Sequence, residues 1–484
     1  MGIKSFEGTA FDFGPSRILF EHTQQRRITR TDRANAPTSM GLIVGGASDA
    51  QIQNNLARLS RRRPDRLMRT AALTLITTIA LGVTAPGAGI ADVPPASLPP
   101  VRVKVTGDPA PVETLRLAIL TSAKAVVPDI RAAGNMSLTE TAPPLQPLPL
   151  ASAMALRAIV QVSASGVQPV THSVPVEITN ASFPWSDAQD LLVSNSPETL
   201  PFGKVLLSTP VSAGQTVRLL YHHQNGSRDR HMVIAVNLSN PARTPIALWI
   251  AGAAGAEGTD DFGQGHTAAR AFLEQYWHRA GFMARIPPNT TLPLFLHDLA
   301  PQAVASGLVQ LALIDGARLN VDVFARLEGE MDPPLLSFAP NFDKVHPRGT
   351  FEHPRVMQAL TYTVGDPPLA MTVGDDRDAL HEAQTGAPLK GNYGVIYAFP
   401  IDLTNPRPLP AILGLIFQAS GGDGGGTVLV DDQVFDLAWV KSGERRMVTT
   451  LRLAPGEHRT VLISTMPESG ANYPVRLSLG SEYK

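Results

Sequence analysis

Short segments in which apolar and polar residues alternate dominate the middle and the end of this chain. In the segment LNVDVFARL, Leu319, Val321 and Val323 alternate with polar neighbours, which is the period of two expected for a half-buried β-strand. Comparable segments bounded by Asn, Gly, Pro or Ser recur between residues 191 and 330 and include VRLLYHH, HMVIAVNL, IALWIAG and GLVQLALI. This pattern predicts a β-sandwich in residues 191–330.

One segment inside this region has the period of a helix instead. In HTAARAFLEQYWHRAG, apolar residues recur at intervals of three or four from Ala269 to Ala280, as expected for an amphipathic helix. Gly265 precedes the segment, and Gly281 stands where a residue that ends a helix is expected. We therefore expect one short helix inserted in the middle domain.

Strand patterns separated by turns also fill residues 335–484, after a boundary at MDPP. They include YGVIYAFPIDLTN, AILGLIFQA, VFDLAWV and RTVLIS, and seven or more short strands of this kind predict a second β-sandwich. Residues 92–190 open with the proline-rich spacer DVPPASLPP and continue with strand candidates such as VRVKV and HSVPVEITN. We expect a spacer followed by an N-terminal β region there.

The two predicted sandwiches share an internal repeat. VNLSNPARTPIALWIAG from Val236 and IDLTNPRPLPAILGLIF from Ile401 each end a strand at Asn-Pro and then enter another apolar strand. Farther along, IPPNTTLPLFLH and LAPGEHRTVLIS each lead from a proline turn into a strand. Because proline removes a ladder donor and restricts the residue before it, Asn-Pro ends a strand. The two matches in the same order predict two related sandwiches.

This arrangement resembles the immunoglobulin-like sandwich modules of bacterial secreted and cell-surface proteins. The resemblance covers residues 191–484 and rests on turn chemistry, and the cysteine and tryptophan hallmarks of antibody domains are absent. It implies a mainly β fold of tandem immunoglobulin-like sandwich domains and an extracytoplasmic setting. It implies no activity, because one fold hosts many functions.

An apolar segment near the N-terminus has the parts of a secretory signal. The basic stretch SRRRPDR precedes the apolar run from Ala71 to Val83, and small residues follow as far as Ala91. The run is shorter than the ~20 apolar residues that cross a membrane. We expect residues 68–91 to be a signal peptide cleaved between Ala91 and Asp92, with an uncleaved anchor and a buried helix as alternatives.

Residues 1–67 show little apolar periodicity and contain the polar run QQRRITRTDR. Such a composition predicts disorder. We hypothesise that Met68 is the true translation start and that the preceding residues are not part of the working protein.

Composition narrows the class of protein. Hydrophobic residues make up 43% and charged residues 17% of the chain, which is typical of a globular protein. The net charge is −1, acidic residues outnumber basic ones after Ala91, and no basic cluster is present there, so a nucleic-acid partner is excluded. The chain has no cysteine, which excludes thiol catalysis, disulfides and cysteine-based zinc sites.

Histidines are the remaining candidates for chemistry. His222 and His223 are adjacent, so on a strand they point to opposite faces, and we expect at most one of them to face the core. His266 lies in the predicted helix, and His297 could join one of the others. All four are weak metal candidates, and the expectation is that they are satisfied or surface side chains. We expect no catalytic residue and no cofactor.

Three other features have ordinary structural interpretations. GGDGGG from Gly421 precedes a strand rather than a helix and is interpreted as a hairpin loop. GDDRDALHE from Gly374 lacks the EF-hand spacing and is interpreted as a solvated loop. Tyr276, Trp277 and Trp439 could form a sugar-binding platform, but their places in a helix and a strand favour core packing.

These patterns favour an exported, non-catalytic β-sandwich protein with a structural, adhesive or assembly role in the bacterial envelope or the extracellular space. Its partner would be a cell-envelope glycan or protein, and membrane contact is expected only if the signal segment stays uncleaved. Two alternatives remain open: a carbohydrate-binding accessory protein or hydrolase, and a metal-binding secreted protein.

Overall fold

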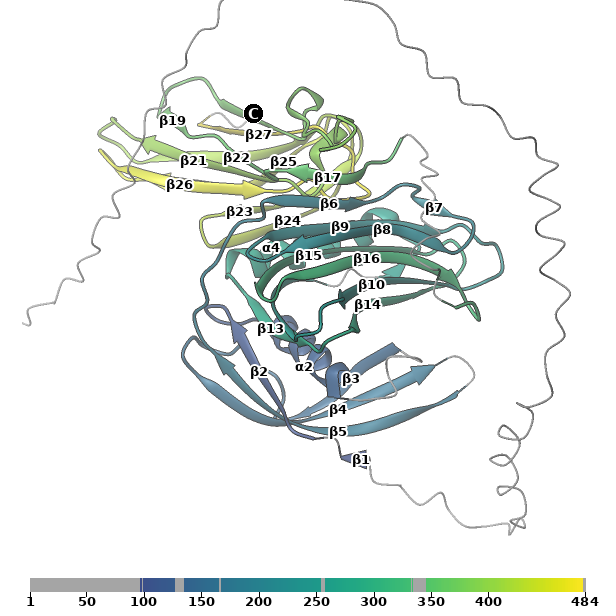
Figure 1. Ribbon diagram of the computed structural model, residues 1–484. Helices are drawn as coiled ribbons and strands as arrows, with labels where there is room; N and C mark the ends of the chain where they lie inside the picture. Colours follow the sequence, from purple (N-terminus) through teal and green to yellow (C-terminus); the bar gives the residue numbers. More distant parts are fainter. Residues whose placement is uncertain are drawn as a thin grey trace, which may run out of the picture. The chain divides into compact units, whose positions relative to one another are not determined.

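The computed structural model describes residues 96–97, 99–126, 135–164, 167–253, 257–331, 333 and 345–481. The predictions for residues 1–67 and for the signal segment 68–91 lie outside this part. Among the described residues the strands form four sheets, so the predicted mainly β fold is confirmed (Figure 1).

The N-terminal β region is a curved sheet covered on one face by a helix (Figure 1). Its elements are β1 (Ala96–Ser97), β2 (Val101–Thr106), α2 (Val112–Val126), β3 (Asn135–Ala142), β4 (Ala153–Ala164) and β5 (Val167–Asn180). Leu115 and Ile119 of α2 pack in one buried cluster with Val103 and Val176 of the sheet. The sequence pattern did not predict α2, although its buried Leu115, Ala118 and Ile119 follow the helical period.

The middle region folds as the predicted β-sandwich. Its elements are β6 (Asp190–Ser194), β7 (Thr199–Leu200), β8 (Lys204–Ser212), β9 (Thr216–Asn225), β10 (Met232–Asn240), β11 (Ile246–Ala253), β12 (Glu257–Gly258), α4 (Asp261–Trp277), β13 (Gly281–Ile286), β14 (Thr290–Leu299), β15 (Val304–Asp315) and β16 (Arg318–Leu327). The sheet β14-β10-β16-β8 faces the strands β6-β9-β15-β11-β13. Val236, Val321, Leu219 and Val309 belong to the buried core that the two layers share.

The C-terminal region is a second sandwich. The strand β17 (Arg348–Glu352) precedes it. The sandwich's own elements are β18 (Arg355–Met357), β19 (Leu360–Thr363), β20 (Leu369–Val373), the 3-10 turns η2 (Asp376–Asp378) and η3 (Lys390–Asn392), β21 (Ile396–Thr404), β22 (Ala411–Ala419), β23 (Gly424–Val430), β24 (Gln433–Val440), β25 (Arg445–Leu453), β26 (His458–Thr465) and β27 (Val475–Gly480). One sheet has the order β18-β21-β26-β23-β24 with β19 also on β21, and the other has β20-β27-β22-β25. Phe399, Leu415 and Ile463 lie in their common core.

The predicted repeat appears as two equivalent strand ends. The side-chain amide of Asn240 donates to the carbonyls of Thr244, Ile286 and Pro287 at 2.9–3.0 Å. The amide of Asn405 donates in the same way to the carbonyls of Leu409, Leu453 and Ala454 at 3.0, 3.4 and 2.9 Å. In each copy the side-chain oxygen accepts the backbone N–H two residues later. The two Asn-Pro turns therefore form the same hydrogen-bonded structure.

Backbone pairing joins the three regions. β13 pairs with β2, which connects the middle sandwich to the N-terminal region, and β17 pairs with β6, which connects the segment before the C-terminal sandwich to the middle one. Among the described residues these pairings produce one 13-stranded sheet. The regions are therefore held together by main-chain hydrogen bonds as well as by side chains.

Helix α4 differs from its prediction at both ends. It begins at Asp261, five positions before the expected start at His266, and Gly281 is the first residue of β13 rather than the end of the helix. None of the helices in the described part of the chain is long and apolar enough to span a membrane.

Candidate functional site

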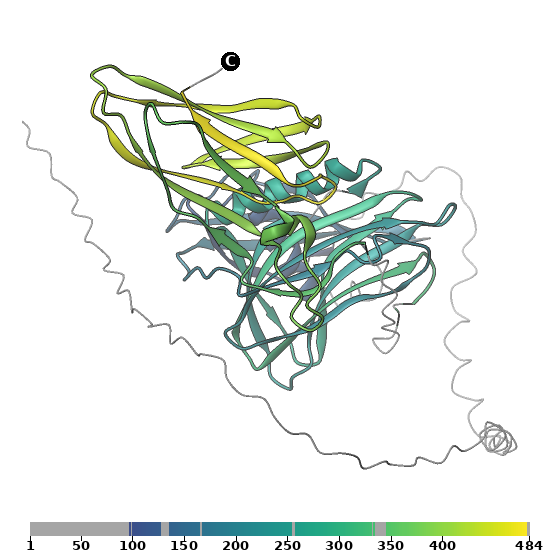
Figure 2. The same cartoon turned by 90° about the horizontal axis from the view of Figure 1, so that it is seen from above.

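Helix α4 lies between the two sandwiches (Figure 2). Ala269, Phe272 and Leu273 share a buried apolar cluster with Leu220 of β9 and with residues of the C-terminal sandwich such as Phe399. α4 occupies the connection between β11 and β13, and the hairpin β23–β24 occupies the corresponding connection between β22 and β25. The two insertions pack against each other, so the parts in which the repeats differ contribute to the interface.

Two glycines permit the close approach at this interface. A Cβ on Gly265 of α4 would lie 1.9 Å from the carbonyl oxygen of Ser469, and a Cβ on Gly425 of β23 would lie 2.6 Å from the ring of Phe262. Side chains at either position would separate the two elements. The prediction that GGDGGG is a hairpin loop is wrong for its last three glycines, because these glycines are the first residues of the buried strand β23.

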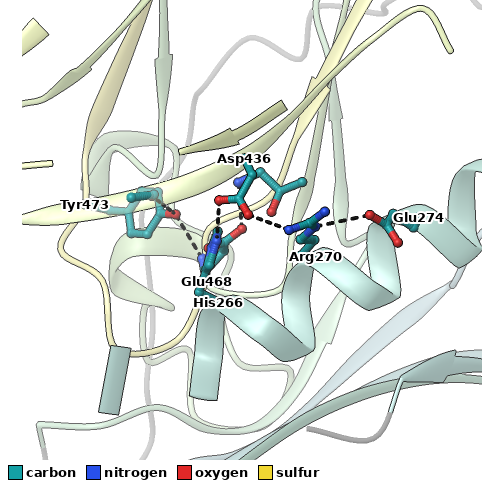
Figure 3. A network of polar contacts seen from close by, with 8 residues as sticks. His266, Arg270, Glu274, Asp436, Glu468 and Tyr473 are labelled. Carbon is teal, nitrogen blue, oxygen red and sulfur yellow. Dashed lines mark hydrogen bonds and ion pairs between the residues drawn. The ribbon is translucent and has the colours of Figure 1, made fainter. Parts of the chain in front are cut away.

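A polar network crosses the same interface (Figure 3). His266 Nδ1 lies 2.6 Å from Glu468 Oε2, and His266 Nε2 lies 2.8 Å from Asp436 Oδ1. Arg270 also donates to Asp436, at 2.5 Å, and to Glu274, at 3.2 Å. The network links one face of α4 to the C-terminal sandwich.

Glu468 is fully buried, and its carboxylate accepts hydrogen bonds from His266 and from the backbone of Thr427. Its Oε1 accepts the backbone N–H of Thr427 at 2.7 Å, while its own N–H donates to Tyr473 Oη at 3.0 Å. A buried carboxylate is stable only when paired and hydrogen-bonded, and His266 supplies the pairing cation. Burial raises the pKa of Tyr473 well above its usual value, so this hydroxyl stays protonated.

His266 is an imidazolium at neutral pH. Partial burial disfavours the charged ring and lowers its pKa, but the hydrogen bonds and negative charges of Glu468 and Asp436 outweigh burial and raise the pKa to about 9. Both ring nitrogens then carry protons and donate to the two carboxylates. This histidine is a structural cation, and its lone pairs are not available to a metal.

A second buried cation fixes the other side of α4. Arg218 of β9 donates to the carbonyls of Pro354 and Gly394 and lies over the rings of Phe272 and Tyr276, 5.3 and 5.7 Å from their centroids. Burial lowers the pKa of Arg218 to about 10, so the guanidinium remains charged at neutral pH. Carbonyl dipoles and aromatic faces surround the guanidinium, and the nearby negative charge of Asp187 also favours its charged form.

His222 belongs to a cluster of metal-ligating side chains at the start of α4. His222 Nε2 lies 2.8 Å from Asp261 Oδ1, and His346 Nε2 lies 3.0 Å from Glu198 Oε2. Ligand atoms of Glu198, His222 and Asp261 all lie within 4.8 Å of one another. The hydrogen bond from His222, followed by the charges of His222 and His346, holds the pKa of Asp261 below its usual value against the effect of burial.

The four histidines do not converge on one site. His223 contacts Ser194 Oγ and the Pro197 carbonyl, and burial lowers its pKa to about 3. His297 contacts Tyr221 Oη at 2.7 Å, whereas His266 binds the carboxylates of the C-terminal sandwich.

His222 and His223 are both buried, so the prediction that at most one faces the core is wrong. It assumed one solvated face, but β9 is covered on both sides. Leu219 belongs to the middle core, whereas its neighbour Leu220 belongs to the cluster around α4.

The remaining sequence features are the aromatic residues and the acidic loop. Tyr276 packs edge-on against Trp185, and Trp439 packs edge-on against Phe262 while keeping 45% of its surface exposed. Asp375 caps a 3-10 turn and pairs with Arg377. Neither Tyr276 nor the acidic loop forms a candidate site.

Sequence patterns missed most of the clustered residues. Asp261 follows another aspartate before the helix, a signal for a helix start rather than for a ligand. Glu198, His346, Asp436 and Glu468 lie in no recognisable motif, and only the chain path brings them to α4.

The fold and these clusters define a mainly β protein built from two related sandwiches with an N-terminal β region. No family model matches the chain, and no curated protein matches it.

Among solved structures, the chain is similar to Lac15 from a marine microbial metagenome, with 12% identity, 79% of this chain and 96% of that chain covered, and a TM-score of 0.13. It is also similar to the CBM22-1-CBM22-2 tandem domain from Paenibacillus barcinonensis Xyn10C, with 10% identity, 59% and 92% coverage and a TM-score of 0.13. A third similar structure is the CupB6 tip adhesin from Pseudomonas aeruginosa, with 12% identity, 59% and 82% coverage and a TM-score of 0.13. TM-scores of this size carry no argument about function.

Proposed function

We propose that this protein is an exported, non-catalytic component of the bacterial envelope or the extracellular space, with a structural, adhesive or assembly role. The observation that carries the proposal is the way the β regions are joined. β2 pairs with β13, β17 pairs with β6, and Glu468 binds His266 across the sandwich interface. Domains in one chain move relative to each other by default. Strand pairing and a buried ion pair between the regions therefore favour a role in which the regions keep a fixed arrangement.

Export is the part of this proposal that rests on sequence. Residues 68–91 have the basic, apolar and small-residue parts of a signal peptide. We expect the protein in the extracytoplasmic fraction of its host, with Asp92 as its first residue by mass spectrometry. Recovery from the cytoplasm, or mature peptides from residues 1–60, would contradict this expectation.

The proposed role can be tested by loosening the interface without changing the surface. Glu468→Gln keeps the shape of the side chain but removes the charge that His266 neutralises, whereas Glu177→Gln removes an exposed charge paired with Arg102. In a strain lacking the protein, we expect a loss of envelope integrity or surface adhesion. At equal secreted amounts, Glu177→Gln should restore it and Glu468→Gln should not. Equal restoration by both variants would count against a role that depends on fixed geometry.

A carbohydrate-binding accessory protein or hydrolase is the second candidate. The half-exposed Trp439 beside Phe262 favours it, because an exposed aromatic face can stack on a sugar ring. A glycan array probed with the protein and with Trp439→Ala tests this candidate. Glycan binding that the variant loses would favour it over the first proposal, and an array without binding would count against a carbohydrate-binding accessory role.

A further inference from the structure

We propose that Glu198, His222 and Asp261, together with His346, form a binding site for a first-row divalent metal ion, with Zn²⁺ as the best fit. The site lies where α4 begins. It goes beyond the proposed envelope role and does not depend on it.

The geometry of the cluster is the first argument. Glu198 lies between β6 and β7, His222 on β9, Asp261 at the first residue of α4, and His346 in the segment before β17. The ligand atoms of the first three lie within 4.8 Å of one another, and His346 Nε2 is 3.0 Å from Glu198 Oε2. Zinc binds imidazole nitrogen and carboxylate oxygen at ~2.0–2.2 Å, so small side-chain movements would bring these atoms around one ion.

The donor set is the second argument, because it selects among metals. Two imidazoles and two carboxylates suit Zn²⁺ and its first-row neighbours, whereas Ca²⁺ and Mg²⁺ prefer oxygen ligands alone. Two carboxylates also balance the charge of a divalent ion at a partly buried position. Three of the four side chains keep some exposure, from 27% for Glu198 to 53% for Asp261, which leaves a path for the ion.

His222 supplies the third argument. Its side chain is only 1% exposed, and its Nδ1 is a buried atom without a hydrogen-bond partner among the described residues. The contact with Asp261 thus gives a partner to one of the two ring nitrogens, Nε2. Nε2 is therefore the ring nitrogen that faces the cluster, and burial of the ring holds this atom in place as a preorganised ligand for an ion.

The competing interpretation is two ordinary histidine–carboxylate pairs that bind nothing. The chain contains a matched example of such a pair: His231 Nδ1 lies 3.1 Å from Asp298 Oδ1, and both side chains are about half exposed. Variants at His231 therefore report what losing a histidine–aspartate pair does by itself.

The test is a metal titration of the full chain after treatment with a chelator. We expect saturable binding of one Zn²⁺ per chain in competition with a chromophoric chelator, and visible absorption bands of low-coordinate Co²⁺ when cobalt is used instead. Glu198→Gln and His222→Gln should each weaken Zn²⁺ binding by at least ~10-fold and change the Co²⁺ spectrum. His231→Gln should do neither, and excess Ca²⁺ or Mg²⁺ should not displace the zinc.

The half-buried Glu198 keeps the test decisive even if replacing the buried His222 prevents folding. Absence of stoichiometric Zn²⁺ binding to the folded chain would overturn the proposal. Binding that survives Glu198→Gln unchanged, or that falls equally in His231→Gln, would overturn it as well.

Discussion

At the scale of single residues, buried asparagines end the strands of both sandwiches. Asn240 and Asn405 each direct a side-chain amide inward to three carbonyls. Asn225 repeats the arrangement without a following proline, donating to the carbonyls of Arg230, Leu299 and Ala300. These amides satisfy carbonyls at strand ends, where the ladder no longer does.

Replacing Asn405 with alanine should therefore destabilise the C-terminal sandwich. The change removes the shared donor of three carbonyls, one of them on the last residue of β25 and one in the turn that follows. Buried unsatisfied groups cost ~1–3 kcal/mol each before water or relaxation compensates. We expect a loss of ~2–3 kcal/mol in the free energy of unfolding, measured by denaturant titration. Asn472→Ala, at an exposed amide, should change it by less than ~0.5 kcal/mol. A similarly small change for Asn405→Ala would show that this amide does not contribute to the stability of the fold.

At the scale of elements, the sequence predicted the strands of both sandwiches and the apolar stripe of α4, because each follows a simple period. The sequence pattern placed the start of α4 too late, because Gly263 and Gly265 are unfavourable in a helix. Gly265 is required there by the carbonyl of Ser469 in a distant loop, and no local pattern reports such a contact. The faces of β9 were misjudged for the same reason, since a strand covered on both sides has no polar face to read.

A substitution in α4 separates helix propensity from this contact. In an isolated helix, alanine is favoured over glycine by ~1 kcal/mol. In this protein we expect Gly265→Ala to destabilise the fold by ~1–3 kcal/mol, because the new methyl group would collide with the Ser469 carbonyl. Denaturation and amide exchange of the loop around Ser469 measure the effect. Thr267→Ala, at an exposed position of the same helix, should be neutral or stabilising, and stabilisation by Gly265→Ala would contradict the observed packing.

At the scale of the whole molecule, the sequence predicts the repeat but not the strand pairings that join the regions. Two Asn-Pro strand ends in the same order predict two related sandwiches. The pairing of Val105 with Phe282 joins β2 to β13 across a long stretch of sequence, and no pattern in either strand specifies the other. The candidate metal cluster could not be predicted for the same reason. Glu198 and His346 are far from His222 in the sequence, and only the folded paths of β9, α4 and the segment before β17 bring them together.

The interface between the sandwiches should make stability depend on pH through His266. Its pKa in the folded protein is about 9, raised from 6.5. A raised pKa means that the stabilisation is fully present below about pH 6.5 and is lost as the pH rises through 9. We expect the free energy of unfolding to fall between pH 7 and 9.5 by at most ~1.4 kcal/mol per pH unit, and His266→Gln to remove this component.

Lys124 titrates in the same pH range, but its effect on the free energy of unfolding has the opposite sign. The contribution of His266 is therefore measured as the difference between wild type and His266→Gln. Burial lowers the pKa of Lys124 from 10.5 to about 8, and its penalty on the folded state is therefore relieved as the pH rises above 8. Lys124 donates to the carbonyls of Pro293 and Leu294, away from the contacts of His266, so its contribution should cancel between wild type and His266→Gln. Denaturant titrations of both proteins from pH 6 to 10 give that difference. A difference that stays constant with pH would mean that His266 is not the cation that joins the sandwiches.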